Sequence, residues 1–389
     1  MTKRFRIGLN FFFDNQSNSG IVNYIYNIIS ALNTLKDSEK PFLNIFYSSN
    51  SPINYIKEIN YPFVKYQLFQ KSSSNKYVRK ANSIIRRLIH RDIYLHSKYF
   101  SKIDCLYPYF EFMDNQFEEA PNKIHWLVDF NNRSFSNHYY DNGESMRIYQ
   151  EKITGLFGEK VILSSNALHD ELKSYHPNYK CNISVLRFAS CVPAMTEKDV
   201  IEVKSKYQIN DTYFMSPNQF WEHKNQEIVL KAIQVIKQHN PDIKFKILFT
   251  GSQDVNRGKG RYADKLLTII KEHSLDNYIQ FLGVVDRKEQ LALMKGARAL
   301  IQPSFYEGWS TLVEEAKALN QYILLSDLPV HREQIDQNVT FFDPNDHHKL
   351  ADIILEETLN PHKLNITDYS KHVQKFGETL RSTFVEQKR

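Results

Sequence analysis

The sequence predicts an α/β protein in which helices cover parallel sheets, arranged as two domains. Short apolar runs alternate with amphipathic helical patterns along almost the whole chain, which is typical of repeated βαβ units. At 389 residues the chain is too long for one ordinary hydrophobic core. Its composition, 42% hydrophobic and 24% charged, is that of a globular protein.

The first domain, residues 1–190, opens with an apolar run at Arg6–Phe12 that predicts a buried strand. A helix is expected at Gly20–Leu35, where apolar side chains recur at helical spacing. Ser165 is the expected N-cap of a helix at Asn166–Tyr175, and Ser184–Pro193 predicts the last strand and the linker. The remaining strands of this domain are predicted near Asn44–Tyr47, Val64–Phe69, Cys105–Tyr107, Lys123–Val128 and Val161–Ser164.

The second domain, residues 191–367, repeats the alternation of strands and helices. A final charged helix, Asp368–Phe384 within the segment 368–389, is long enough to cross back onto the first domain. The predicted strands are Tyr213–Ser216, Lys244–Phe249, Tyr278–Leu282, Ala299–Gln302, Tyr322–Ser326 and Val339–Phe342. The predicted helices are Asn225–Gln238, Tyr262–His273, Lys288–Lys295 and Leu312–Leu319.

Several classes of protein are disfavoured by simple features of the chain. No apolar run reaches the roughly 18 residues that a membrane-spanning helix needs. The first residues are interpreted as a strand and not as a signal peptide, because the apolar part is short and Asp14 follows it. The cysteines Cys105, Cys181 and Cys191 lack metal-ligand spacing, which predicts buried free thiols in a reducing, cytoplasmic compartment.

A basic segment at residues 65–102 contains the single acid Asp92 and predicts an amphipathic helix near 76–91. One interpretation is a helix of the first domain with its apolar face in the core. The other is docking on an anionic membrane surface or on a lipid diphosphate, which would make the protein peripheral on the inner face of the cytoplasmic membrane. No nucleic-acid partner is expected, because no recognised binding motif accompanies the charge.

The most informative stretch is Pro303–Ala316, where an apolar strand leads through a glycine turn into a helix. Glu307 lies in the loop and Glu315 in the opening turns of the helix, so both can face one pocket at the carboxyl end of a strand. Carboxylates accept hydrogen bonds from sugar hydroxyls, and a helix N-terminus favours phosphate. The combination predicts a site for a nucleotide sugar.

The same stretch also allows a purely structural interpretation. Residues Thr311–Glu314 have the spacing of a capping box, which would give Glu314 a capping role and leave Glu315 unexplained. Ser310, Thr311 and Leu312 are expected to offer backbone N–H groups to a diphosphate at the helix start. Ser310 and Thr311 could equally be helix caps, and the two roles are compatible.

These motifs resemble the retaining nucleotide-sugar glycosyltransferases of the GT-B fold, family 4 type, also described as glycosyl transferases group 1. The spacing of Glu307-Gly308 and Glu315-Ala316 matches the paired glutamates of that family. The resemblance is also carried by Ser216–Asn225, Phe281-Leu282-Gly283, Phe342-Asp343-Pro344 and the Gly20-Ile21 loop. It implies two Rossmann-like domains with parallel sheets facing a central cleft, and no metal or other cofactor; the chain has no Asp-x-Asp motif.

The resemblance also implies roles for individual residues. Glu307 would hold donor-sugar hydroxyls, Glu315 the ribose hydroxyls, and Lys224 the negative charge that develops on the leaving diphosphate. Taken alone, Lys224 would be interpreted as an ordinary solvated lysine. The first domain would bind the acceptor and the second the donor. Further donor-binding residues are expected at Gly308, Trp309, Ser310, Thr311, Leu312, Gln219, Asn225, Gly251, Leu282, Gly283 and Gly20.

The chain departs from the family pattern at Gln219, where many relatives have an arginine five residues before the lysine. An uncharged amide cannot replace that cation. The candidates to supply the missing charge are Arg187, Arg257 and Arg261; alternatively, Gln219 uses hydrogen bonds alone.

In the first domain, Asp129 and His125 end a predicted strand where relatives have a His–Asp pair near the sugar and acceptor. Val128 directly precedes Asp129, so the histidine of that pair is either displaced or absent in this chain. His125 falls on the same side of the strand as Asp129 by alternation, which makes both candidate catalytic residues. A lone histidine is also commonly a satisfied core residue.

The function expected from the sequence is transfer of a hexose from a nucleoside-diphosphate sugar to a hydroxyl of a glycan or lipid-linked acceptor, with retention. The resemblance implies that this transfer takes place in bacterial surface polysaccharide synthesis, where the product is O-antigen or capsule. A sugar-nucleotide epimerase or hydrolase of the GT-B fold and a catalytically silent nucleotide-sugar-binding scaffold are the alternatives. No carboxylate is placed as an obvious nucleophile, which favours a front-face route.

Overall fold

The computed structural model divides the chain into two compact units. It describes residues 4–13, 19–68, 84, 102–110, 117, 120–134, 143–156, 159–251 and 261–386. The first unit comprises Met1–Ser136, Tyr140–Cys191 and Ser370–Arg389; the second comprises Val192–Tyr369 together with Asn137–Tyr139. The predicted boundaries, at residues 190 and 367, lie beside the boundaries at Cys191 and Tyr369.

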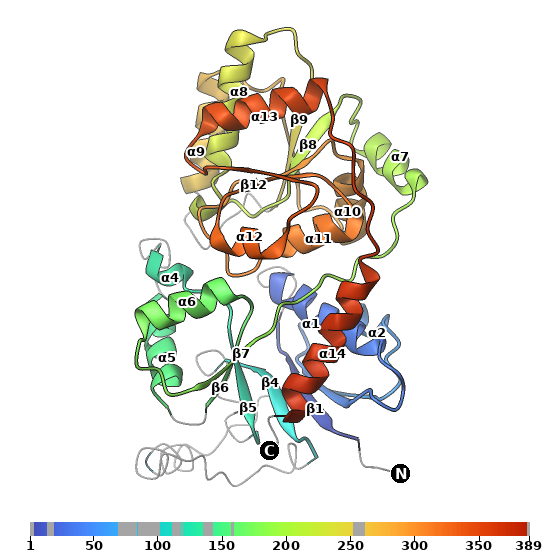
Figure 1. The fold of residues 1–389 in the computed structure, drawn as a ribbon. Helices are drawn as coiled ribbons and strands as arrows, with labels where there is room; N and C mark the ends of the chain where they lie inside the picture. Colours follow the sequence, from blue (N-terminus) through green and yellow to red (C-terminus); the bar gives the residue numbers. More distant parts are fainter. Residues whose placement is uncertain are drawn as a thin grey trace. The chain divides into compact units, whose positions relative to one another are not determined.

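The first unit is built on a seven-stranded parallel sheet with the strand order β3-β2-β1-β4-β5-β6-β7 (Figure 1). Helix α14 belongs to this unit and packs on α1 (Figure 1), where Gly377 lies so close to the carbonyl of Ala31 that a side chain would clash. The strands are β1 (Arg6–Phe11), β2 (Phe42–Tyr47), β3 (Val64–Leu68), β4 (Cys105–Tyr109), β5 (Lys123–Leu127), β6 (Lys160–Leu163) and β7 (Asn182–Val185). The helices are α1 (Ser19–Asn33), α2 (Ile53–Lys57), α4 (Asn131–Ser134), α5 (Gly143–Gly155), α6 (Asn166–Tyr175) and α14 (Ser370–Glu386).

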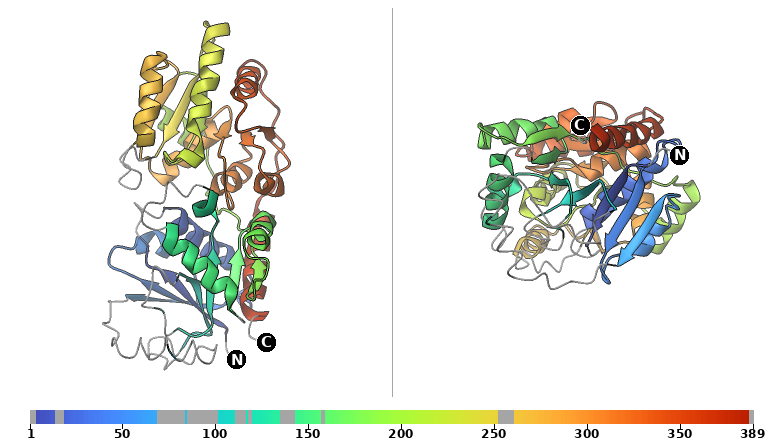
Figure 2. Two further views of the ribbon diagram at one scale, coloured as in Figure 1. Left: turned by 90° about the vertical axis from the view of Figure 1, so that its left-hand side faces the viewer. Right: turned by 90° about the horizontal axis from the view of Figure 1, so that it is seen from below.

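The second unit has a six-stranded parallel sheet with the order β10-β9-β8-β11-β12-β13. Its strands are β8 (Tyr213–Ser216), β9 (Lys246–Thr250), β10 (Ile279–Gly283), β11 (Leu300–Gln302), β12 (Ile323–Ser326) and β13 (Val339–Phe342). Its helices are α7 (Glu197–Lys206), the 3-10 helix η3 (Glu222–Lys224), α8 (Gln226–His239), α9 (Arg261–Glu272), α10 (Arg287–Gly296), α11 (Thr311–Leu319), α12 (Pro329–Gln334) and α13 (His347–Leu359). Helices α8 and α9 lie side by side in Figure 2.

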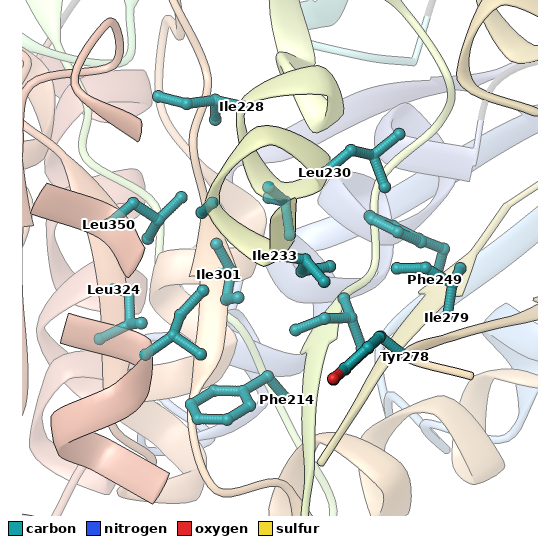
Figure 3. Packing of buried hydrophobic residues seen from close by; sticks show 14 of the residues in the cluster. Phe214, Ile228, Leu230, Ile233, Phe249, Tyr278, Ile279, Ile301, Leu324 and Leu350 are labelled. Atoms are coloured by element: carbon teal, nitrogen blue, oxygen red, sulfur yellow. The ribbon is translucent and has the colours of Figure 1, made fainter. Parts of the chain in front are cut away.

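The strands of the second unit are apolar on both faces, as expected for a parallel sheet covered on both sides. Successive side chains point to opposite faces, so Phe214 joins the cluster under α8, α9 and α13, while Tyr213 and Met215 join the cluster under α10 and α11. Figure 3 shows the first cluster, in which Phe214, Ile301 and Leu324 come from neighbouring strands. The two cores hold the strand ends in fixed positions.

The strand order places a topological switch point in each sheet. Chain order runs outward in opposite directions from β1 and β4 in the first sheet, and from β8 and β11 in the second. Open α/β sheets bind ligands in the crevice outside the carboxyl ends of the strands at this point, because the two connections diverge there. The Lys224 loop follows β8 and the Glu307 loop follows β11, so the two predicted donor-binding loops meet at this position.

The fold class predicted from the sequence is confirmed: the described residues form two sheets, both parallel, with helices on their faces. Helices α2, α4, α5, α7, α12 and α13 were not among the predicted elements. Cys105 and Cys181 are buried as predicted, and burial raises the pKa of Cys105 to about 12. Cys191 is only half-buried. In the described part of the chain, no helix is long and apolar enough to cross a membrane.

Candidate active site

The centre of the candidate site is the carboxylate of Glu307, which is held by three donors on one oxygen. Its Oε1 accepts from Lys224 Nζ at 2.6 Å, from Gln302 Nε2 at 2.6 Å and from Ser304 Oγ at 2.7 Å. Gln302 ends β11 and is almost fully buried, and Ser304 is fully buried. Among the described residues, the second oxygen, Oε2, has no hydrogen-bond partner. The carboxylate is therefore clamped through one atom and presents the other.

The ionisation state of Glu307 follows from this environment. Its side chain is only 10% exposed, and burial alone would raise its pKa. The charge and hydrogen bond of Lys224 oppose that effect and hold the pKa of Glu307 below its usual value. Glu307 is thus a carboxylate at neutral pH, and it can accept a hydrogen bond but cannot donate one.

Lys224 lies at the end of the short 3-10 helix η3, with its side chain 19% exposed. Within the described residues its ammonium donates only to Glu307, so two of its three N–H groups are available to a ligand. The positive charge is therefore fixed beside the predicted sugar-binding carboxylate and can still reach an anion.

Asn225 fixes the Lys224 loop against its neighbours. Its backbone has a left-handed conformation, with φ of 56°, between η3 and α8. Its side-chain Nδ2 donates to the carbonyl of Pro303 at 3.0 Å and to that of Pro344 at 2.8 Å. This is the role of a tie between three loops. The donor contact predicted for Asn225 stays a prediction, and this tie was not anticipated from the sequence.

Glu315 is paired with an arginine that sequence reasoning had not assigned to the site. Its Oε1 accepts from a terminal guanidinium nitrogen of Arg287, at the first residue of α10, at 2.5 Å. Glu315 is 4% exposed, and within the described part of the chain its Oε2 has no hydrogen-bond partner. Both signature glutamates therefore share one design, with one oxygen held by a cation and the other left for a ligand.

The start of α11 corrects the capping interpretation. The N-cap is Ser310, whose Oγ accepts from the N–H of Val313 at 3.4 Å. With the cap at Ser310, the third helical position is Val313, so Glu314 lies too far along the helix to complete a capping box. Glu314 instead accepts from Lys317 at 2.9 Å and Gln334 at 3.0 Å, and from the hydroxyl of Tyr369.

At the start of α11, one backbone N–H group already has a hydrogen-bond acceptor within the protein, and two have none among the described residues. The N–H of Ser310 donates to Gln334 Oε1 at 3.2 Å, so the phosphate contact predicted for it is already replaced by an internal bond. The N–H groups of Thr311 and Leu312, at the first two helical positions, have no partner among the described residues. They are the donors that the helix offers to an anion. In the same loop Gly308 is buried and Trp309 half-buried.

Two glycines shape the neighbouring strand ends. Gly251 follows β9 with φ of +131°, and a Cβ there would lie 2.9 Å from the carbonyl oxygen of Asn218. Its N–H donates to the carbonyl of Gly283, which ends β10 with φ of +68°. The predicted donor-binding residues Gly251 and Gly283 are thus brought together by a direct backbone bond. Leu282 packs its side chain into the core beside α10, and Val284 is 80% exposed.

The position of Gln219 is compatible with a ligand contact but supplies no charge. Its side chain is exposed, while its backbone carbonyl accepts from Gln226 Nε2 at 2.8 Å. Of the three arginines considered as substitutes, Arg187 lies in the first unit. Arg257 and the side chain of Arg261 lie outside the described residues. So does the basic helix predicted near 76–91, except for Ile84, whose side chain is exposed. Arg287 is the described cation that the structure adds to this edge of the sheet.

In the first unit, Gly20 lies in the first turn of α1, after the switch-point strand β1. It is exposed, and a Cβ at this position would meet no atom within 4 Å. No packing constraint within the described residues therefore requires glycine here. A role in close approach of a ligand stays a prediction.

His125 and Asp129 are separated by the structure. The ring of His125 is fully buried in the middle of β5, with Nδ1 at 2.8 Å from Tyr149 Oη and Nε2 at 3.0 Å from Glu159 Oε2. Both ring nitrogens are occupied, so we assign His125 to the interior of the first unit. Asp129 lies beyond the strand end and half-buried; its Oδ1 accepts from the N–H of Asn131 at the start of α4. Asp129 remains a candidate.

Comparison with known proteins supports this interpretation of the second unit. Residues 198–373 match the family model described as glycosyl transferases group 1. The O-antigen chain mannosyltransferase RfbU of Salmonella typhimurium is 27% identical over 165 residues. That alignment covers 42% of each chain, so the match spans less than half the length of this curated relative.

Solved structures extend the likeness in fold to almost the whole chain. A glycosyltransferase from Rickettsia africae has a TM-score of 0.59 at 16% identity, covering 99% of this chain and 94% of its own. Anabaena HepE, solved in complex with UDP-glucose, has a TM-score of 0.64 at 12% identity, covering 98% and 97%. At these identities the likeness shows the fold alone. Residues 198–373, within and just beyond the second unit, are thus similar to glycosyl transferases group 1, and the chain as a whole has the GT-B fold that its motifs predicted.

Proposed function

We propose that this protein transfers a hexose from a nucleoside-diphosphate sugar to a hydroxyl group of a glycan or lipid-linked acceptor, with retention of the anomeric configuration. The observation that carries the proposal is the geometry of Glu307, which is held through Oε1 and has no described partner on Oε2. A fixed carboxylate oxygen selects hydroxyl donors, and a sugar ring presents several. A hydroxyl mismatched to such a buried acceptor costs about 1–3 kcal/mol.

The donor is expected to lie along the carboxyl edge of the second sheet. Its ribose would bind Oε2 of Glu315, and its base would lie near Phe281–Val284. Its diphosphate would meet Lys224 and the open N–H groups of Thr311 and Leu312, which supply a positive charge and a helix N-terminus. This arrangement accounts for each part of a nucleotide sugar.

Stabilisation of the leaving group is the catalytic contribution that this edge can make. As the bond from the anomeric carbon to the phosphate oxygen breaks, negative charge develops on the diphosphate. In the proposed complex Lys224 and the α11 N–H groups would face that charge before the reaction, so that little reorganisation would be needed. The acceptor oxygen then bonds to the anomeric carbon, and its proton passes to the leaving phosphate on the same face. Trapping a covalent sugar–enzyme adduct by rapid quench would refute this front-face route.

Relatives support the choice of sugar and pathway class. RfbU is described as an O-antigen chain mannosyltransferase, and HepE was solved with UDP-glucose. We therefore propose a role in bacterial surface polysaccharide synthesis, in the cytoplasm or at the inner face of the membrane. We propose that the first unit binds the acceptor and that Asp129 contacts it. Because the chain lacks an Asp-x-Asp motif, we also propose that transfer needs no divalent metal, so EDTA should leave the rate unchanged.

The decisive experiment is a thermal-shift panel of UDP-, GDP-, ADP- and dTDP-sugars that includes GDP-mannose and UDP-glucose, followed by transfer assays with the donor that stabilises. We expect one nucleotide to raise Tm and its sugar to be transferred only when a glycan acceptor is added. Rapid donor turnover that ignores the acceptor would indicate an epimerase or hydrolase. Binding without turnover would indicate a scaffold, and binding of no donor would refute the proposal.

A further inference from the structure

His331, in the short helix α12 after β12, is fully buried beside the candidate site. Its Nδ1 lies 2.8 Å from the backbone carbonyl of Ser326. A carbonyl oxygen can only accept, so the proton of this hydrogen bond must be on Nδ1. The Nδ1–H group of His331 is therefore a hydrogen-bond donor to the backbone of Ser326, the last residue of β12.

From Ser326 a chain of hydrogen bonds leads to Glu307. Ser326 Oγ donates to the carbonyl of Ser304 at 2.7 Å, and Ser304 Oγ donates to Glu307 Oε1 at 2.7 Å. Ser326 and Ser304 are both fully buried. In such an interior each bond constrains the next, because no water is available to replace a partner that moves. His331 is the rear end of this chain.

The other ring nitrogen of His331 determines its charge. Nε2 is buried and has no hydrogen-bond partner in the described part of the chain. A protonated ring would bury an unmatched N–H, so the neutral ring is favoured, and burial lowers the pKa of His331. The charged groups that act on it are Glu307, Lys224 and Asp327, and Asp327 is itself paired with Arg332 at 2.7 Å.

We propose that His331 is a positioning residue for Glu307, acting as the neutral Nδ1–H tautomer through Ser326 and Ser304. The inference rests on the proposed function, since it concerns the orientation of the carboxylate that would hold the donor sugar. His331 itself touches no reacting atom. Its donor anchors the β12 end, which sets the position of the Ser304 hydroxyl and so the direction in which Oε2 of Glu307 points.

Three substitutions of His331 distinguish the effect of the hydrogen-bond donor at Nδ1 from the effect of the volume that the ring fills. The side-chain nitrogen of His331→Asn can replace Nδ1, the nitrogen of His331→Gln reaches toward the place of Nε2, and His331→Phe keeps a ring without any donor. We expect Phe and Gln to lower kcat for sugar transfer about 10-fold, because the carboxylate is misoriented. We expect Asn to restore kcat to near the wild-type value.

The control is Arg332→Ala, which removes an exposed neighbour on the same helix and should leave transfer unchanged. Binding of the nucleoside diphosphate that the thermal-shift panel selects should also survive in His331→Phe, because Glu315 and Lys224 are untouched. A kcat in His331→Asn as low as in His331→Phe, or wild-type kcat in His331→Phe, would overturn the proposal.

Two measurements need no activity, and they separate this inference from the proposed function. The ¹⁵N shifts of the His331 ring should show the proton on Nδ1 at pH 7. Crystal structures should show the bond between Ser304 and Glu307 kept in His331→Asn and lost in His331→Phe. A proton on Nε2 alone, or an unchanged bond in the Phe variant, contradicts the positioning role even if no donor is ever found.

Discussion

Each unit of this protein buries a carboxylate network at its parallel sheet, and the two networks differ in their position along the strand and in how the carboxylate is held. In the first unit His125, Tyr149 and Glu159 satisfy one another, and the phenol of Tyr149 also donates to the carbonyl of Tyr109. In the second unit three donors converge on Oε1 of Glu307, and Oε2 is left without a described partner. The first network is closed and the second is open.

The comparison shows that burial and charge alone do not distinguish a functional site from a structural one. Both networks combine a buried histidine or lysine with a carboxylate, and both lie on or beside a central strand. What distinguishes the Glu307 network is its position at the end of a strand and a carboxylate oxygen, Oε2, that has no described hydrogen-bond partner. His125 lies in the middle of β5, whereas Glu307 follows the carboxyl end of β11 at the switch point. The second network can accept a ligand at Oε2 of Glu307 without breaking any of the described hydrogen bonds.

The largest expected effect comes from removing the Glu307 carboxylate, the centre of the second network. Glu307→Ala should lower kcat for transfer on the order of 10³-fold, because the oxygen that holds the sugar is lost together with the partner of Lys224. The exposed Glu356→Ala is the matched control and should leave kcat unchanged. Steady-state kinetics and circular dichroism check the pair; wild-type rates in Glu307→Ala would remove Glu307 from the site.

Removing His125 from the first network should lower the stability of the fold and leave the rate of transfer unchanged. His125→Phe removes the hydrogen bonds that the two ring nitrogens make to Tyr149 and Glu159, and we expect the free energy of unfolding to fall by about 3 kcal/mol. Urea denaturation measures this loss. For the protein that remains folded, kcat and KM should match the wild type. A kcat reduced tenfold without a loss of stability would return His125 to the catalytic residues.

The Arg287–Glu315 pair sharpens the comparison at the ribose position. In Arg287→Ala the Glu315 carboxylate is left buried without its cation and loses its fixed orientation. We expect the nucleoside diphosphate that the thermal-shift panel selects to bind about 10-fold more weakly, since a charge-assisted hydrogen bond typically contributes about 1.5–3 kcal/mol. Isothermal titration measures the change, and Lys288→Ala, an exposed neighbour on α10, is the control. Unchanged affinity for that nucleoside diphosphate in Arg287→Ala would exclude Arg287 as a support for the ribose site.

The depressed pKa of Glu307 predicts how the open network responds to pH. A carboxylate whose folded pKa lies below its unfolded value stabilises the fold above the unfolded pKa, and this contribution is lost as pH falls through the folded pKa. The wild type should therefore exceed Glu307→Gln in Tm at pH 7, and the gap should shrink below about pH 4.5. Calorimetry of both proteins across pH tests the sign, and a gap that widens on acidification would contradict the ion pair.

The smallest effect concerns the helix start between the two glutamates. Ser310→Ala removes the side-chain cap of α11 and should lower stability by about 1 kcal/mol. Thr311→Ala should lower stability less, because Thr311 is the first helical residue and not the cap. Chemical denaturation of the two variants compares them. The reverse order would restore the capping box that the sequence suggested at Thr311–Glu314.

The sequence predicted most of the second unit and part of the first. Strands such as Tyr213–Ser216 and Val339–Phe342 were placed to the residue, since their apolar runs are bounded by polar residues. Helix α7 was missed, because its ten residues contain only three apolar side chains and gave a weak helical period. Its start is instead marked by a capping box between Thr196 and Asp199, which was readable in the sequence.

The signature glutamates, the lysine loop and the parallel α/β class follow from the sequence, because each depends on residues close together in the chain. Tertiary structure decided the partners: Arg287 for Glu315, the tie from Asn225 to Pro344, and the route from His331 to Glu307. It also decided that both ring nitrogens of His125 have hydrogen-bond partners, while Oε2 of Glu307 has none among the described residues. These pairings join segments far apart in sequence, and a hydrogen bond between them depends on strand order and register, which no local pattern encodes.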